Sequence, residues 1–438
     1  MLKFGTDGVR GEFGKDLTES YALELAQVAS RVLRCKRVVI GRDTRESGAL
    51  LEAAMAKGLN AVGVEVVLVG VAPTPAVAFL ARSHGSVAIA ITASHNLYQD
   101  NGIKIFGDGG RKLTDQEQQQ IEHGMSALEI ESKSGVLTGT SYRPELLDEY
   151  CAALVRLVPE RALQNLHVAL DCANGAFSNV APEVFSRLGA TVTTINATPN
   201  GRNINLECGA THPESLRTVV KSVGAQLGIA FDGDGDRLIA VDEKGDIVDG
   251  DHLLAISARN MKRRGTLRGN KVVVTVMTNL GFHHAMNRAD IEVLTTPVGD
   301  RAVLEALEEN SLSLGGEQSG HIIYRDLATT GDGLLGALKL GELLGESKKS
   351  LSEIARESMT SLPQVLINLR LKQRVSGVDR MFENEIATAE KTLGESGRVL
   401  VRASGTEPVV RVMVEAPTNE IANSVATSLA EAITARLG

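Results

Sequence analysis

The sequence has no tryptophan, few other aromatic residues and few cysteines. Aromatic side chains make up 3% of the 438 residues, and the four cysteines lie far apart without a C-x-x-C pair. In a chain of this length, isolated cysteines indicate buried thiols rather than a disulfide framework or a zinc site. Hydrophobic residues make up 43% and charged residues 23%, which is typical of a globular protein.

The chain also lacks an excess of positive charge. Lys and Arg number 46 against 54 Asp and Glu, a formal net charge of −8, whereas nucleic-acid-binding proteins usually present a basic face. No stretch approaches the ~20 consecutive apolar residues of a membrane span. The first residues also lack the apolar core of a signal peptide. We therefore expect a cytoplasmic protein that binds neither nucleic acid nor membrane.

Glycine, in contrast, is abundant. The chain has 44 glycines, about a tenth of its residues against the usual ~7%. They are scattered rather than collected in a low-complexity tract, which excludes a collagen-like or disordered chain and favours many tight turns. At roughly 150 residues per domain, the length predicts about three domains.

Three regions share one order of segments, in which apolar, β-branched runs alternate with helix-sized gaps. The first strands are predicted at 37–40, 167–170 and 271–276, the second at 64–69, 191–195 and 291–295, and the third at 87–91, 226–231 and 311–314. Strands separated by helix-sized gaps imply crossovers and largely parallel sheets. We therefore expect three similar mixed or parallel α/β sandwich domains.

The remaining tail has a different pattern and predicts a smaller C-terminal α+β domain. Strands are predicted at 364–371, 397–401 and 409–414, with a helix at 378–393. Thr418 is predicted to cap a last helix whose buried face carries Ile421, Val425, Leu429 and Ile433. The predicted domains are 1–150, 151–250, 251–363 and 364–438, with 357–363 as a linker before the last.

Dense polar loops follow the third strand of each region, at 92–96, 232–237 and 315–321. Because ligands bind beyond the carboxyl ends of strands in open parallel sheets, these loops predict three walls of one central cleft.

Asp232, Asp234 and Asp236 alternate with glycines, so three carboxylates can face one point. Oxygen ligands of this kind suit Mg²⁺. A calcium EF-hand is excluded because Arg237 stands where its sixth-position glycine is required and 238–241 is a predicted strand. The alternative is a solvated acidic turn.

Ser94 follows a buried strand and could be a nucleophile or phosphate carrier, although a turn-capping serine is the alternative and no G-x-S-x-G elbow surrounds it. Lys104 follows an Asn-Gly turn and could be an ordinary surface lysine. Glu317 and Ser319 could hold sugar hydroxyls, and His321 could transfer a proton or simply form structural hydrogen bonds.

Two further loops carry arginines. The first, at 402–411, combines a guanidinium fork with hydroxyl and backbone donors, which suits an anion, although an ordinary hairpin turn is the alternative. Its candidate ligands are Arg402, Ser404, Gly405, Thr406 and Arg411. In the second, a glycine-spaced loop at 5–11, Arg10 could contact a phosphate.

Taken together, these motifs resemble the α-D-phosphohexomutase superfamily and, within it, the family of bacterial phosphoglucosamine mutases. The resemblance covers the whole chain in the right order. It rests on FGTDGVRG (4–11), TASHN and DNGIK (92–96 and 100–104), DGDGDR (232–237), GGEQSGHI (315–322), TTGDG (329–333) and RASGTEPVVR (402–411). Departures from the usual pattern include Leu97 in place of a proline.

The resemblance implies a reaction and a role for each residue. Phosphorylated Ser94 and Asp232, Asp234 and Asp236 would bind one Mg²⁺ per chain. Arg10, Lys104 and Arg237 would surround the transferring phosphoryl group, with Lys104 a candidate proton-transfer partner. Glu317 and Ser319 would hold the sugar, with His321 assisting nearby, and the 402–411 loop would hold the phosphate that does not react. A homo-oligomer is compatible with the resemblance, but no sequence pattern indicates one.

The expected reaction interconverts glucosamine 6-phosphate and glucosamine 1-phosphate through a 1,6-bisphosphate, feeding UDP-N-acetylglucosamine and cell-wall precursor synthesis. Two alternatives stay open: a phosphomannomutase/phosphoglucomutase, which would share Ser94 and the metal loop, and a non-catalytic sugar-phosphate-binding protein.

Overall fold

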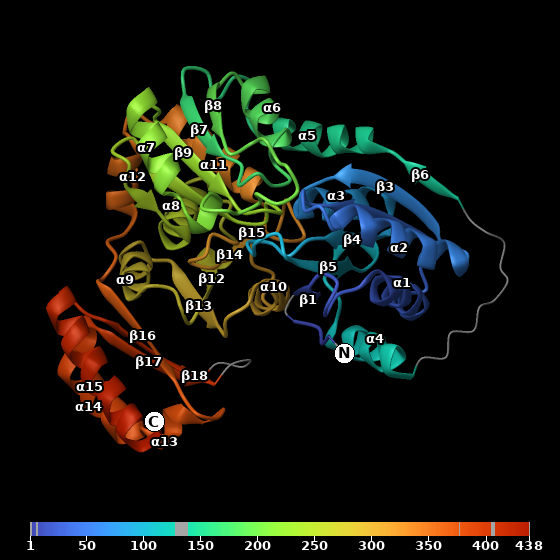
Figure 1. The fold of residues 1–438 in the computed structure, drawn as a ribbon. Helices are drawn as coiled ribbons and strands as arrows, with labels where there is room; N and C mark the ends of the chain where they lie inside the picture. The colour runs from blue at the N-terminus through green and yellow to red at the C-terminus, as the bar shows by residue number, and fades with distance from the viewer. Residues whose placement is uncertain (1, 6–7, 128–138, 376, 404–407, 438) are drawn as a thin grey trace. The chain divides into compact units, whose positions relative to one another are not determined.

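A computed structural model describes all residues except 1, 6–7, 128–138, 376, 404–407 and 438 (Figure 1). The chain forms two compact units. The first unit consists of Met1–Met277 and Ile291–Ser358, and the second of Thr278–Asp290 and Met359–Gly438.

The first unit begins with an α/β region built on a mixed sheet, whose strand order is β1-β5-β4-β2-β3-β6. Its elements are β1 (Val9–Glu12), α1 (Glu19–Leu33), β2 (Arg37–Arg42), α2 (Gly48–Ala61), β3 (Glu65–Val71), α3 (Thr74–His84), β4 (Val87–Ile91), β5 (Asp100–Phe106), α4 (Asp115–Ala127), β6 (Thr140–Tyr142) and α5 (Leu147–Arg156).

The central strands of this sheet, such as β2, are largely apolar because helices cover both faces of the sheet. Val38 and Ile40 of β2 are buried in one cluster with residues of α1, α2 and α4, whereas Val39 is buried on the opposite face with residues of α3. Successive side chains of a strand point to opposite faces, so burial on both faces requires a continuous apolar run.

The next two regions repeat this design. The second contains β7 (His167–Asp171), α6 (Val180–Arg187), β8 (Thr191–Ile195), α7 (Glu214–Val223), β9 (Leu227–Phe231), β10 (Leu238–Asp242) and β11 (Ile247–Val248). The third contains α8 (Gly250–Arg263), β12 (Lys271–Thr275), β13 (Glu292–Thr296), α10 (Asp300–Glu309), β14 (Leu314–Gly316), β15 (Ile322–Tyr324), α11 (Gly333–Glu346) and α12 (Leu351–Ser358).

Strand order confirms the predicted repeat. The first strand of each region lies between the second and the third, as β3-β2-β4, β8-β7-β9 and β13-β12-β14, and these pairs are parallel. An antiparallel strand then returns beside the third strand: β5, β10 and β15. The three predicted polar loops are therefore equivalent connections, each leading from a third strand to its antiparallel neighbour.

The second unit is a three-stranded antiparallel sheet covered by helices, ordered β16-β18-β17. Its elements are α9 (Leu280–Arg288), β16 (Gln364–Arg370), α13 (Val378–Met381), α14 (Glu383–Leu393), β17 (Arg398–Ala403), β18 (Val409–Glu415) and α15 (Asn419–Leu437). Its core joins strand residues such as Val412 and Val414 to Leu429 and Ile433 of α15, as an α+β domain requires.

Four details of the predicted elements are wrong. The third strand of the third region begins at Leu314 rather than ending there, because Ser311 adopts a positive φ of 52° in the turn after α10. The helix predicted at 378–393 is divided at Phe382, where φ is −119°. Ile421 was predicted on the buried face of the last helix, but it is 41% exposed. Finally, α12 continues to Ser358, so the first two residues of the predicted linker are helical.

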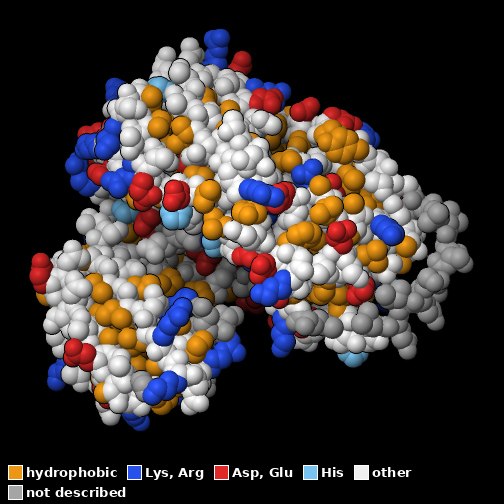
Figure 2. Space-filling model, in the orientation of Figure 1, with side chains coloured by type: hydrophobic (Ala, Val, Ile, Leu, Met, Phe, Trp, Pro, Cys, Tyr) orange, Lys and Arg blue, Asp and Glu red, His pale blue; other side chains and the backbone are white. Residues whose placement is uncertain are grey.

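Charged side chains of both signs are interspersed on the face of the molecule in Figure 2. Among the described residues, no helix combines the length and apolar character that crossing a bilayer requires.

Candidate active site

Ser94 lies in a strained turn directly after β4. Its side chain is 2% exposed, and its φ of +53° is unusual for a residue other than glycine. Its N–H donates to Thr92 Oγ1 at 2.9 Å. The Ser94 Oγ donates to Asp232 Oδ2 at 2.6 Å, so the two loops meet through this hydroxyl. Backbone strain of this kind is found mainly at functional sites.

Three buried carboxylates follow β9 in the equivalent loop. Ligand atoms of Asp232, Asp234 and Asp236 lie within 4.8 Å of one another, and each residue is at most 3% exposed. Gly235 permits the turn between them, with φ of +77°. Asp234 Oδ1 and Asp236 Oδ1 have no hydrogen-bond partner. A cation would satisfy both oxygens, so the described residues include a buried aspartate cluster that fits a metal ion.

Two residues of the first region bind this metal loop. From β5, Lys104 Nζ donates to Asp234 Oδ2 at 2.8 Å and to Asp236 Oδ2 at 2.7 Å. At the start of α3, the Thr74 hydroxyl also donates to Asp234, and its N–H donates to the Asp234 carbonyl oxygen at 2.9 Å. The strand that returns from the Ser94 loop thus places an ammonium group among the carboxylates.

Burial and neighbouring charges shift the acids in opposite directions. Burial, together with the charges of Asp236 and Asp234, raises the pKa of Asp232 well above its ordinary value. Burial alone would also raise the pKa of Asp236, but Lys104, His321 and Arg237 bring it below the ordinary range. Three carboxylates in this space therefore repel one another strongly, which favours a bound cation.

Arginine and histidine side chains surround Ser94. Arg10 Nη1, on β1, donates to Asn96 Oδ1 at 3.0 Å, and Arg237 Nε lies 3.8 Å from Asp236 Oδ1. His95 Nδ1 lies 3.5 Å from Ser94 Oγ. Burial, together with the charges of Arg237 and Arg10, lowers the pKa of His95 to about 4, so its imidazole is neutral near pH 7.

The third loop contributes Glu317, Ser319 and His321. Glu317 Oε1 accepts from the Gly299 N–H at 3.1 Å, and Ser319 is exposed. His321 is 2% exposed, its Nε2 lies 3.7 Å from Asp300 Oδ2, and its backbone pairs with that of Arg237. The second and third loops are thus adjacent, with His321 close enough to affect the ionisation of Asp236.

The remaining predicted ligands belong to the second unit. Arg402 and Arg411 are directly opposite each other on β17 and β18. Burial lowers the pKa of Arg402, and the charge of Arg411 lowers it further. Ser404, Gly405 and Thr406 lie outside the described residues.

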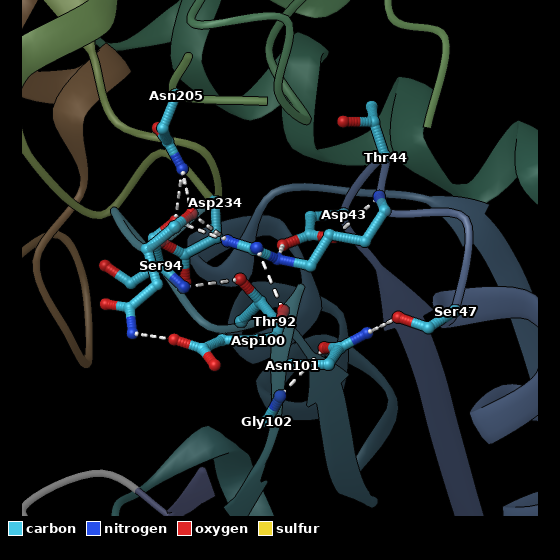
Figure 3. A network of polar contacts seen from close by, with 12 residues as sticks. Asp43, Thr44, Ser47, Thr92, Ser94, Asp100, Asn101, Gly102, Asn205 and Asp234 are labelled. Atoms are coloured by element: carbon cyan, nitrogen blue, oxygen red, sulfur yellow. Dashed lines mark hydrogen bonds and ion pairs between the residues drawn. The ribbon is translucent and has the colours of Figure 1, made fainter. Parts of the chain in front are cut away.

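Several residues at this site were not predicted from the sequence. Asn205 binds the backbone of the Ser94 loop (Figure 3). Arg45 binds the same loop and is itself held by Asp43, and Thr74 contacts the metal loop. A usable signal for Asp43 and Arg45 was the charged turn at 41–45, immediately after a buried strand.

The comparison with protein families covers nearly the whole chain. Four models of phosphoglucomutase/phosphomannomutase domains match: alpha/beta/alpha domain I at residues 1–131, domain II at 148–245, domain III at 249–362 and the C-terminal domain at 366–432. The chain belongs to the phosphoglucomutase/phosphomannomutase family, with three α/β/α domains and a C-terminal domain.

Curated relatives are similar over their full lengths. The phosphoglucosamine mutase of Desulforudis audaxviator is 47% identical over 98% of this chain and 97% of its own. That of Frankia alni is 48% identical over 99% and 98%.

Solved structures share the fold. A phosphoglucomutase/phosphomannomutase family protein of Burkholderia thailandensis matches with a TM-score of 0.82 and 26% identity, covering 98% of this chain and 97% of that one. The N-acetylphosphoglucosamine mutase of Aspergillus fumigatus, solved with GlcNAc-6P and magnesium, matches with a TM-score of 0.70 and 17% identity, covering 99% and 95%.

Proposed function

We propose that the chain is active as a phosphoglucosamine mutase, interconverting glucosamine 6-phosphate and glucosamine 1-phosphate. The main support is the 47% identity to a phosphoglucosamine mutase over nearly the whole chain. The contact between Ser94 Oγ and Asp232 at 2.6 Å supports the same reaction, because it joins a candidate phosphate carrier to a candidate metal site.

In the proposed reaction, Ser94 carries a phosphoryl group and transfers it to a sugar hydroxyl. The sugar oxygen forms a bond to phosphorus as the bond to Ser94 Oγ breaks. In this step Lys104 acts as a neutral amine that receives the hydroxyl proton, and the departing Ser94 Oγ takes up a proton in exchange. The resulting 1,6-bisphosphate reorients in the site and returns its other phosphoryl group to Ser94. Positioning and charge neutralisation account for most catalysis of this kind.

Asp232, Asp234 and Asp236 would hold one Mg²⁺ together with an oxygen of phosphorylated Ser94. When bound, the ion supplies positive charge that stabilises the phosphoryl oxygens. Arg10 and Arg237 add positive charge from the side chains around Ser94. We assign sugar binding to Glu317 and Ser319, with His321 assisting, and binding of the second phosphate to Arg402, Ser404, Gly405, Thr406 and Arg411.

The test is isomerisation of glucosamine 6-phosphate by the full chain, with Ser94 phosphorylated, in the presence and absence of Mg²⁺. We expect turnover that requires both Mg²⁺ and the phosphate-sized mass increase on Ser94, and that is lost in Ser94→Ala. Faster turnover of mannose or glucose phosphates would overturn the glucosamine assignment. Tight sugar-phosphate binding without any isomerisation would show a binding protein instead.

A cytoplasmic location and a homo-oligomer stay predictions. All four cysteines are free, as expected in a reducing compartment.

A further inference from the structure

Arg45 is a fully buried arginine in the turn between β2 and α2, and its guanidinium uses every donor that it has. Nη2 donates to the carbonyl oxygens of Ser94 at 3.0 Å and Asn96 at 2.8 Å. Nη1 donates to the carbonyl oxygens of Leu97 and Asp100. Nε donates to Asp43 Oδ2 at 2.9 Å. An arginine has five N–H donors, so all of them are occupied.

Four of these five bonds end on one short segment, residues 94–100. The fifth bond, from Nε to Asp43, fixes the guanidinium itself. Asp43 is also completely buried, and its Oδ1 accepts the backbone N–H of Arg45 at 3.0 Å. A planar fork fixed in this way presents its donors in one defined orientation. The carbonyl groups that face it therefore set the path of the Ser94 loop.

A second region of the chain supports the same loop from another direction. Asn205 Nδ2 donates to the carbonyl oxygens of Ser94 at 2.8 Å and Asn96 at 2.9 Å, and Figure 3 shows its amide pointing toward Ser94. Space beside this carbonyl is limited, since a Cβ on Gly233 would lie 2.7 Å from the Ser94 oxygen. The Ser94 carbonyl is thus held by two donors and closely packed.

The geometry points to Arg45 as a positioning residue for phosphoryl transfer at Ser94, a role that rests on the function proposed above. Arg45 acts through the backbone and does not touch Ser94 Oγ. Its bonds keep Ser94 in the strained conformation with φ of +53°, in which Oγ meets Asp232. Without them, the serine would relax toward an ordinary backbone conformation and leave the aspartate cluster.

Three variants separate positioning from simple stability. Arg45→Met removes all five guanidinium bonds but leaves Asp43 as a buried charge without its ion-pair partner, which is costly for folding. The double variant Asp43→Asn/Arg45→Met removes that charge as well. Arg45→Lys keeps a positive charge but not the planar fork. Arg42→Met is the control, because Arg42 is a neighbouring arginine whose side chain binds Glu52.

We expect kcat to fall by at least about 10²-fold in Arg45→Met, because small displacements of reacting groups have effects of that size. KM for the sugar phosphate should change little, since Arg45 is not assigned to the sugar. The double variant should regain thermal stability without regaining kcat, and Arg45→Lys should recover only part of the lost kcat. Arg42→Met should keep the wild-type kcat, even if the loss of its pair with Glu52 lowers the stability. A double variant with wild-type kcat would overturn the proposal.

Amide hydrogen exchange provides a readout that does not depend on the reaction. Exchange within residues 94–100 should become at least about tenfold faster in Arg45→Met and in the double variant. The reason is that losing a single hydrogen bond from a charged group already costs enough free energy for a tenfold change in the opening equilibrium. Unchanged exchange would overturn the proposal even if the enzyme is active. A wild type that does not isomerise glucosamine phosphate would overturn the function, while exchange still reports whether Arg45 holds the loop.

Discussion

At the scale of the residue, the aspartate cluster concentrates negative charge in side chains that are almost completely buried. Lys104 binds Asp234 and Asp236, but one oxygen of each remains without a hydrogen-bond partner. Buried carboxylate oxygens without partners are costly. This cost falls when a divalent cation binds, which is why the cluster suits a metal better than it suits a purely structural role.

Replacing one carboxylate should therefore remove both metal binding and activity. In Asp234→Asn, we expect kcat/KM to fall by at least about 10²-fold, because the ion supplies several kcal/mol of charge stabilisation. Mg²⁺ should also no longer raise the melting temperature. Asp246→Asn, which changes an exposed acid, is the control and should behave as the wild type. Undiminished Mg²⁺ stabilisation in Asp234→Asn would contradict the assignment.

Asp332 is a buried acid outside the aspartate cluster, and it should make the free energy of unfolding depend on pH. Burial raises its pKa to about 6, although Tyr150 Oη donates to both of its oxygens at 3.0 Å. Because the unfolded value is about 3.9, the folded state binds this proton more tightly. The resulting stabilisation is fully present below about pH 4 and is lost as the pH rises through about 6.

The Asp332→Asn variant should lose this dependence while keeping an acceptor for the Leu335 N–H at the start of α11. Between about pH 4.5 and pH 7 the Asp332 carboxyl group should cost the wild type about 2 kcal/mol of unfolding free energy, a loss that the variant should not show. Denaturant titrations at both pH values measure the difference, with Asp148→Asn on the exposed side of α5 as the control. An identical change in both proteins would refute the shifted pKa.

The sequence was informative about individual site residues where a polar loop follows a buried strand. Ser94 and the three aspartates occur in such loops, and the structure brings them together. It was less informative about Arg45, which it marked only as part of a charged turn after a strand, and not informative about Asn205. No polar loop directly after a predicted strand marks Asn205, so its bond to the Ser94 carbonyl depends on how the regions pack.

At the scale of the element, predictions from local sequence patterns were correct where burial alone decides the pattern and wrong where tertiary packing decides it. The repeated strands were predictable because helices bury both of their faces and their sequences are continuously apolar. The apolar face of α15 was only partly predictable. Small residues, Ala422 and Ala426, are buried there, whereas Ile421 is exposed, because the close approach of the helix to β16 and β18 selects for size as well as polarity.

The hairpin of β17 and β18 carries an unfavourable pair that an anion would relieve. Arg402 and Arg411 are cross-strand neighbours, and like charges directly opposite each other destabilise a sheet. Arg411→Gln should therefore raise the melting temperature slightly without ligand, but it should abolish stabilisation by inorganic phosphate. Thermal denaturation with and without phosphate tests both effects.

Arg370→Gln is the matched control for this hairpin. It changes an exposed arginine on β16 of the same sheet and should retain the response to phosphate. Loss of the response in Arg370→Gln, or its persistence in Arg411→Gln, would show that the arginine pair is not the anion site.

At the scale of the whole molecule, the chain passes between its two compact units more than once. After Met277 it contributes Thr278–Asp290 to the second unit and then returns to the first. Within the second unit, the Leu280 N–H donates to Glu415 Oε2 at 2.8 Å, and Arg398 Nη2 donates to the Thr278 carbonyl oxygen at 2.8 Å. Helix α9 is therefore expected to unfold with the strands β17 and β18 rather than with its neighbours in sequence.

This division predicts that the two ligands stabilise different parts of the protein. The aspartate cluster belongs entirely to the first unit and the arginine pair to the second, so calorimetry of the full chain should resolve two transitions. A ligand at about 100 times its Kd adds about 2.7 kcal/mol to the part that binds it. Mg²⁺ should shift one transition and inorganic phosphate the other. Amide exchange within residues 278–290 should slow with phosphate but not with Mg²⁺. A single transition that both ligands shift equally would contradict this prediction and would mean that the two units unfold together. The chain crossings at residues 277–291 would then couple the units more strongly than their separate cores indicate.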